Sequence, residues 1–138
     1  MSRKIFVTLP VKDLKKSIAF YAAIGMKNNP AFSDDTAACM VLSDAIHVML
    51  ATHAKFRTIM PAGREIGDPR VTTGVLLAID ADSRAAVDAV VEKATAAGGR
   101  ELHPPEDHGF MYSRAFEDPD GHGWGPFWMD PKAIPPQQ

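Results

Sequence analysis

The sequence predicts an α+β fold of two tandem β-α-β-β-β modules whose mixed sheets curl around a shared cavity. Residues 5–25 and residues 74–98 both read as an apolar, strand-like run followed by an amphipathic helix that ends at glycine. Each helix is followed by three short segments with strand character, separated by turn-forming residues. One such module covers only one face of its sheet, so two modules must pair to bury more surface.

The first module opens with the apolar run at the start of IFVTLPVKDLKKSIAFYAAIG. Asp13 is a suitable N-cap, and Leu14, Ile18 and Tyr21 share one face of the helix that follows, which ends at Gly25. Three strands are then expected, at residues 27–32, 36–42 and 46–52.

The second module repeats this order in GVLLAIDADSRAAVDAVVEKATAAG. Its helix can begin at Asp82 or Ser83, and Gly98 is suited to its C-terminal end. Since 82 − 13 = 69 is half of 138, the Asp82 alternative divides the chain into equal halves. Strands are expected at residues 100–103, 110–117 and 124–129, and the turn DPDGHG (residues 118–123) joins the last two.

The whole chain, residues 1–138, is expected to form a single domain. Module 1 spans about residues 1–53 and module 2 about residues 71–130. The linker between them, about residues 54–70, is rich in proline and glycine and has room for one helical turn at residues 55–60.

The composition excludes several classes of partner. The chain carries 15 basic and 17 acidic side chains, a net charge of −2, without a basic run, so we expect no nucleic-acid partner. No apolar stretch approaches the roughly 20 residues that cross a bilayer, so no membrane partner is expected. A single cysteine and an N-terminus without signal-peptide features lead us to expect a cytoplasmic protein.

Two segments resemble the vicinal oxygen chelate superfamily of glyoxalases, bleomycin resistance proteins and extradiol dioxygenases. FVTLPVKDLKKSIAFYAAIG resembles the strand-helix opening of that superfamily, and FEDPDGHGW resembles the turn before its last strand. The resemblance covers nearly the whole chain and implies a small-molecule ligand and a homodimer. Neither segment carries catalytic groups, so the resemblance speaks for the fold more than for the chemistry.

The resemblance also implies four metal-ligand positions on the cavity faces. Carried over by position, they fall at Phe6, Val75 and Gly125 and near Met49, and none of these side chains is a metal donor. Residues 4–9 and 71–79 contain no His, Glu or Gln, so a shift of one residue leaves both opening strands without a ligand. We therefore predict no metal and no cofactor, with a divalent metal as the alternative.

Two polar side chains stand out among the candidate pocket residues. Strand alternation places His47 on the same face as Met49, where its imidazole could bind a ligand or act as a base. Arg114 alternates with Tyr112, and burying it requires an anionic ligand or a salt bridge to an acid such as Glu117 or Asp107. The full set of pocket candidates is Phe6, Thr8, His47, Met49, Val75, Leu77, Tyr112, Arg114, Gly125 and Phe127.

These observations favour a protein that binds a small organic molecule in a largely apolar cavity without metal. The alternative is a metal-dependent lyase or isomerase, or a dioxygenase, resembling lactoylglutathione lyase, in which His47, Tyr112 or Arg114 would supply the chemistry. A third hypothesis is a partner-binding module with a filled cavity and a large exposed apolar patch. The sequence does not identify a catalytic residue.

Overall fold

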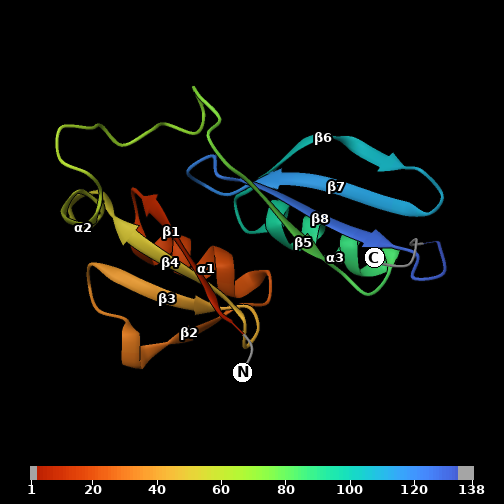
Figure 1. Cartoon of the computed structure of the whole chain (residues 1–138), viewed down its shortest axis with the longest axis horizontal. Coiled ribbons are helices and arrows are strands. Elements are labelled where there is room, and N and C mark those ends of the chain that lie inside the picture. The colour runs from red at the N-terminus through yellow and green to blue at the C-terminus, as the bar shows by residue number, and fades with distance from the viewer. Residues whose placement is uncertain (1–2, 134–138) are drawn as a thin grey trace.

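A mixed four-stranded sheet with one helix on one face forms each half of the chain in a computed structural model that describes residues 3–133 (Figure 1). The first half consists of β1 (Ile5–Val11), α1 (Leu14–Ala23), β2 (Lys27–Asn29), β3 (Ala37–Val41) and β4 (Ile46–Thr52). Its strand order is β1-β4-β3-β2, in which β1 and β4 are parallel and the other pairs antiparallel.

The second half repeats that topology. It consists of β5 (Leu76–Asp80), α3 (Arg84–Ala96), β6 (Arg100–Asp107), β7 (Met111–Glu117) and β8 (Gly123–Met129). The strand order is β5-β8-β7-β6, with β5 and β8 parallel and the other pairs antiparallel. The predicted α+β fold of two βαβββ modules is therefore confirmed.

Both helices begin at the caps that the sequence suggests. The Asp13 carboxylate accepts the Lys16 backbone N–H at 3.1 Å, and the Ser83 hydroxyl accepts that of Ala86 at 3.0 Å. Ser83, rather than Asp82, is thus the second N-cap, so the modules repeat at an interval of 83 − 13 = 70 residues. Within residues 3–133 no helix is long and apolar enough to cross a membrane.

Three predicted elements differ from the structure by more than one residue at a boundary. The strand predicted at residues 27–32 ends at Asn29, because the Asn29 side chain caps a short 3₁₀ helix, η1 (Pro30–Phe32), and proline lacks the N–H a ladder needs. The strand predicted at residues 100–103 continues to Asp107 through two prolines, which an edge strand with register shifts tolerates. The linker helix, α2 (His53–Ile59), begins earlier than predicted because Thr52 caps it.

One apolar core joins the two modules on the helix side of the sheets. Val11, Phe20 and Leu50 of the first module lie in the same cluster as Val91 and Phe116 of the second. In Figure 1 both helices lie behind the strands of their own sheet, and α1 contacts α3. The sheet faces that point away from the helices are consequently left open, and we call them the open faces.

A buried hydrogen-bonded group, the clasp (Tyr21, Asp118 and Trp124), links α1 to the DPDGHG turn. The Tyr21 hydroxyl donates to Asp118 Oδ2 at 2.6 Å and accepts from Trp124 Nε1 at 3.1 Å. Asp118 Oδ1 also accepts the backbone N–H groups of Asp120 and His122, both at 2.9 Å. Burial raises the pKa of both Asp118 and Tyr21, so the group depends on every one of its hydrogen bonds being made.

We expect Tyr21→Phe to lower the free energy of unfolding by about 1–3 kcal/mol, because the buried Asp118 carboxyl loses a donor that water cannot replace. Urea denaturation followed by fluorescence measures the change. Tyr112→Phe is the matched control, since it removes a hydrogen bond to Asp88 that is only partly buried. Equal losses in the two variants would contradict a special role for the clasp.

Candidate functional site

The open face of the first sheet carries four of the predicted pocket residues. Phe6 pairs with His47, and Thr8 pairs with Met49, across the parallel strands β1 and β4. Because side chains alternate along a strand, these four point away from Val7, Leu9, Val48 and Leu50, which pack into the core with α1. The structure therefore brings Phe6, Thr8, His47 and Met49 together on one surface.

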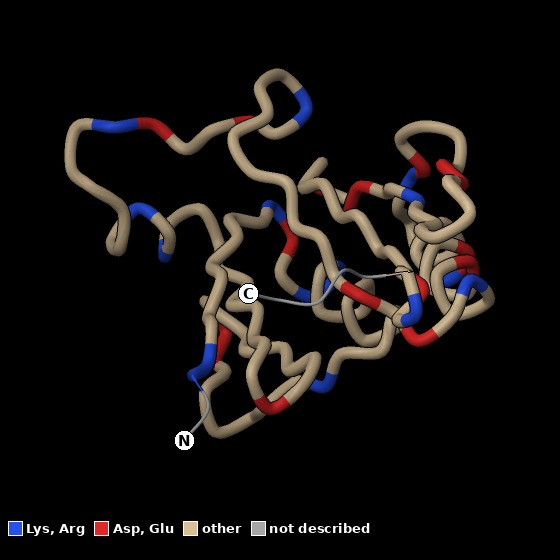
Figure 2. The backbone as a smooth tube through the Cα atoms, turned by 45° about the vertical axis from the view of Figure 1, so that its right-hand side comes forward, with Lys and Arg blue, Asp and Glu red and all other residues tan. Residues whose placement is uncertain are grey.

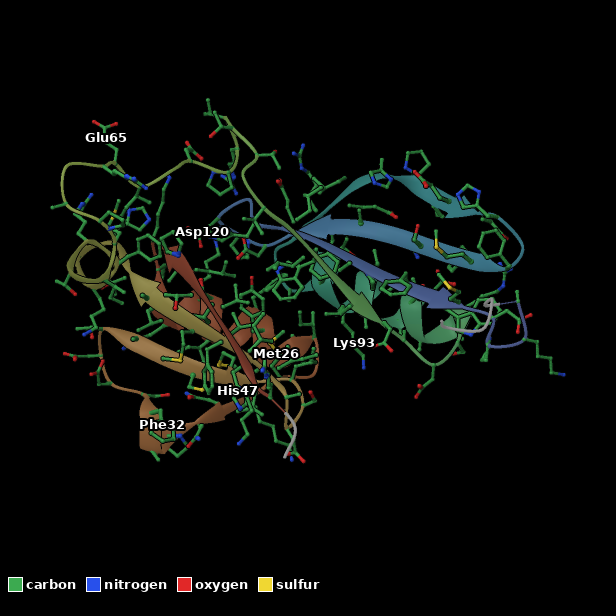
Figure 3. All side chains as sticks on the ribbon, viewed as in Figure 1. Met26, Phe32, His47, Glu65, Lys93 and Asp120 are labelled. Carbon is green, nitrogen blue, oxygen red and sulfur yellow. The ribbon has the colours of Figure 1, made fainter. Side chains whose placement is uncertain are left out.

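His47 is the most unusual polar group on this surface. Its ring, labelled in Figure 3, stacks on Phe6 with 4.3 Å between the ring centroids. His47 is buried, with 8% exposure, whereas Phe6 is 55% exposed. Nδ1 of His47 is buried and has no hydrogen-bond partner among the described residues. A buried polar atom without a partner costs about 1–3 kcal/mol, so a bound molecule that offers it a hydrogen bond would gain affinity.

The open face of the second sheet holds a cavity of about 550 Å³, which we call the sheet cavity. Apolar side chains provide most of its wall, and the polar side chains are few: His103, Glu106 and Ser113. Arg114 also borders the cavity, where its backbone carbonyl lies near Gly125. Gly125 leaves space there, since an added Cβ would meet only the Arg114 carbonyl oxygen at 3.8 Å. The apolar lining consists of Leu76, Leu77, Ala78, Leu102, Met111, Ala115, Trp124, Phe127 and Met129.

The register of β5 changes the expected equivalence between the modules. Leu76 pairs with Gly123 and Ala78 with Gly125, which matches the Phe6–His47 and Thr8–Met49 pairs of the first sheet. Leu76, not Val75, is therefore the counterpart of Phe6, because the second helix is capped one residue later than the Asp82 alternative assumes.

The neighbours of Leu76 take different places from those predicted. Val75 lies just before β5, with 66% exposure, and Leu77 packs against the core although it also borders the sheet cavity. A one-residue shift exchanges the two faces of a strand, which explains both positions. The N-cap alternative Ser83 was the one signal in the sequence that favours Leu76 and Ala78 over Val75 and Leu77.

Tyr112 and Arg114 lie on the helix face of β7, where they bind acids. Arg114 donates to both Glu101 carboxylate oxygens and to Asp88 Oδ1, each at 2.9 Å. The Tyr112 hydroxyl donates to the same Asp88 oxygen at 2.7 Å. This is the salt-bridge alternative for Arg114, although its partners come from α3 and β6.

The two acids that the sequence suggested for Arg114 have other partners. Glu117 binds Arg100 at 2.9 Å, and Asp107 binds Arg84 at 2.6 Å. The residues that actually bind Arg114 are 26 and 13 positions away in the chain, so only the fold could identify them.

The ion pairs of Arg114 stabilise the charged forms of Asp88 and Glu101. Hydrogen bonds from Tyr112 and Arg114 lower the pKa of Asp88, and the hydrogen bond from Arg114 lowers that of Glu101. A lowered folded-state pKa means that the contacts stabilise the fold above the ordinary pKa of each acid. That stabilisation is lost as the pH falls through the lowered values. Arg114 therefore holds the second module together rather than offering a free cation to the sheet cavity.

The metal-ligand positions that the resemblance implies carry no donors in the observed register. They fall at Phe6, Met49, Leu76 and Gly125, whose side chains are hydrocarbon, a thioether or absent. Within residues 3–133 no group of three or more His, Cys, Asp or Glu could hold a metal ion. The donor set therefore does not fit the divalent metal used by relatives.

A second, smaller pocket of about 350 Å³ lies between the modules, and we call it the inter-module pocket. Thr8 and Pro10 of β1 and Phe56 of α2 form one side, and Val75 and Leu76 form the other. Leu76 and Leu102 border both this pocket and the sheet cavity. The two spaces are thus neighbours along the same side of the molecule.

Solved structures with this fold include proteins from several bacteria. A hypothetical protein from S. aureus is 25% identical, with a TM-score of 0.76 over 93% of this chain and 95% of its own. A glyoxalase/bleomycin resistance protein/dioxygenase family enzyme from Burkholderia phytofirmans PsJN is 19% identical, with a TM-score of 0.76 over 93% and 99%. The fosfomycin resistance protein FosX from Listeria monocytogenes is 21% identical, with a TM-score of 0.66 over 96% and 97%.

The sequence itself also identifies the family. No curated protein matches the chain. A model of the glyoxalase/bleomycin resistance protein/dioxygenase superfamily, in contrast, matches residues 5–125, from the start of β1 to the first residues of β8, and includes both module helices. Together with the duplicated βαβββ topology, this match shows that the chain belongs to the glyoxalase/bleomycin resistance protein/dioxygenase superfamily.

Proposed function

We propose that this protein binds a small organic molecule in the sheet cavity and does so without a metal ion. The observation that carries the proposal is the largely apolar cavity of about 550 Å³ on the open face of the second sheet. Ligand pockets commonly have volumes of roughly 300–1,000 Å³ and combine apolar walls with a few polar groups. The residues at the family's metal positions, which carry no oxygen or nitrogen donors in their side chains, support binding through shape and apolar contact.

The cavity wall favours a ligand with a flat or branched apolar part. Phe127 offers an aromatic ring, and Met111 and Met129 offer flexible thioether side chains that adapt to a ligand's shape. Gly125 has no side chain and therefore leaves part of the cavity volume free for a ligand. His103, Glu106 and Ser113 at the wall can bind polar groups that fix the ligand's orientation.

The alternative is a metal-dependent lyase, isomerase or dioxygenase resembling lactoylglutathione lyase. It rests on family membership and on His47, whose buried Nδ1 has no partner among the described residues. A partner-binding module without a ligand is a third possibility, and an open cavity of this size argues against it, because that hypothesis expects a filled one. The cytoplasmic location stays a prediction that fractionation of the native cells would test.

A neutral fluorescent dye such as Nile red tests the binding proposal. We expect saturable binding to the wild type and an affinity about tenfold lower in Gly125→Leu, because the added side chain occupies cavity volume. Gly125→Ala is the matched control and should keep nearly the wild-type affinity. If Gly125→Leu binds the dye as well as the wild type does, the sheet cavity is not the binding site.

The metal-free proposal predicts the response to divalent cations. Zn²⁺, Ni²⁺, Mn²⁺ and Fe²⁺ should each leave the melting temperature unchanged, because only an ion that binds the native state raises stability by mass action. Elemental analysis after exposure and dialysis should find well below one equivalent. One tightly bound equivalent, with a matching rise in melting temperature, would favour the metal-dependent alternative and place His47 among the candidate ligands.

We further infer that the protein is a homodimer. Phe6 and Leu76 are 55% and 71% exposed on the open faces of β1 and β5, and a second copy would cover these apolar side chains. Sedimentation equilibrium should therefore give twice the chain mass. Phe6→Asp should shift the protein toward the monomer while Phe6→Leu should not, and a wild type that sediments as a monomer at micromolar concentration would contradict the inference.

A further inference from the structure

A third pocket, of about 470 Å³, lies where the linker passes the end of β1, and we call it the linker pocket. Unlike the sheet cavity, its wall is mostly polar. Lys12, His53, Arg57 and Arg64 line it from the end of β1, from α2 and from the linker. Figure 2 shows basic and acidic positions next to each other on the linker that arches away from the modules.

The cations of this pocket have unused hydrogen-bonding capacity. Among the described residues, the side chains of Lys12, Arg57 and Arg64 form no ion pair within 4 Å and no hydrogen bond, whereas Arg84, Arg100 and Arg114 all do. An arginine guanidinium carries five N–H donors in a planar fork that matches carboxylate and phosphate oxygens. The pocket therefore presents two such forks and an ammonium group that have no acceptor within residues 3–133.

Two of the three acids in the pocket already accept hydrogen bonds from other groups. Asp120 accepts the Lys12 backbone N–H at 2.9 Å and the Ser17 hydroxyl at 3.4 Å. Asp68 Oδ1 accepts the Arg70 backbone N–H at 3.0 Å. Glu65 lies on the arching linker, well apart from Asp120 in the view of Figure 3. Since three acids balance the three permanent cations, an anion would be held by directed N–H groups rather than by net charge.

The linker pocket and the two apolar spaces are neighbours that share lining residues. Pro10, Gly67 and Pro69 border both the linker pocket and the inter-module pocket. The inter-module pocket in turn shares Leu76 and Leu102 with the sheet cavity. An elongated molecule can thus pass from an apolar wall to a cationic one along a single side of the protein.

We propose that the ligand is an organic anion, with its apolar part in the sheet cavity and inter-module pocket and a carboxylate or phosphate group bound by Arg57 and Arg64. This inference rests on the proposed function and adds the chemical class of the ligand. The ordinary explanation for the two arginines is solvation at the surface, with Arg57 also favourable in the last turn of α2. That explanation predicts no effect of either arginine on ligand affinity.

Dansylaminoundecanoate and its methyl ester form a matched pair of probes. Both carry the same dansyl group and alkyl chain, and only the acid carries a charge. Fluorescence titration of the full-length wild type should show tighter binding of the acid than of the ester. The double variant Arg57→Gln/Arg64→Gln should weaken the acid about five- to tenfold and leave the ester nearly unchanged. Lys93→Gln, which removes an exposed cation on α3, is the control and should change neither.

Equal affinities of the acid for the wild type and the double variant overturn the anion site, and continued binding of the ester leaves the proposed function intact. A parallel loss of both probes, or a loss of the acid in Lys93→Gln as large as in the double variant, also overturns it. If neither probe binds the wild type, the proposed function and the anion site fail together.

Discussion

The buried hydrogen bond between the Tyr21 hydroxyl and the Asp118 carboxyl is the constraint on which the arrangement of the two modules depends. Tyr21 comes from α1, and Asp118 begins the turn before β8, so one 2.6 Å contact joins residues 97 positions apart. Two more bonds from the turn reach the end of β1: His122 Nε2 lies 2.7 Å from the Pro10 carbonyl oxygen, and Asp120 accepts the Lys12 N–H. With the helix sides held together in one core, both open faces point away from that core.

The residues at a few register positions decide which chemistry the open faces can support. The family fold presents one pair of positions on β1 and β4 and the equivalent pair on β5 and β8. Here Met49 and Gly125 occupy positions where metal-using relatives need an oxygen donor. Gly125 leaves volume in the sheet cavity, and Met49 presents a thioether on the open face of the first sheet. These two positions therefore favour apolar contacts over metal binding.

The linker, which carries neither of the family's sequence motifs, shapes the polar end of the proposed site. It supplies Phe56 to the inter-module pocket and Arg57 and Arg64 to the linker pocket. Loops positioned by a rigid scaffold commonly carry specificity, because they can change without disturbing the core. A ligand that contacts both sheets and the linker would be recognised through its apolar part by the sheets and through its charge by the linker.

The sequence by itself determined the repeat, the first helix cap and most strands, because these depend on local periodicity and on residues such as Asp13 and Gly25 whose preferences act within a few positions. It also placed His47 and Met49 on one face, since alternation along a continuous strand needs no tertiary information. Only the tertiary structure decided that Leu76 rather than Val75 matches Phe6, that Asp88 and Glu101 bind Arg114, and that the linker arginines line a pocket. Each of these depends on the register between strands or on contacts between distant segments. The local sequence pattern fits two registers that differ by one residue almost equally well, and such a shift exchanges one face of a strand for the other.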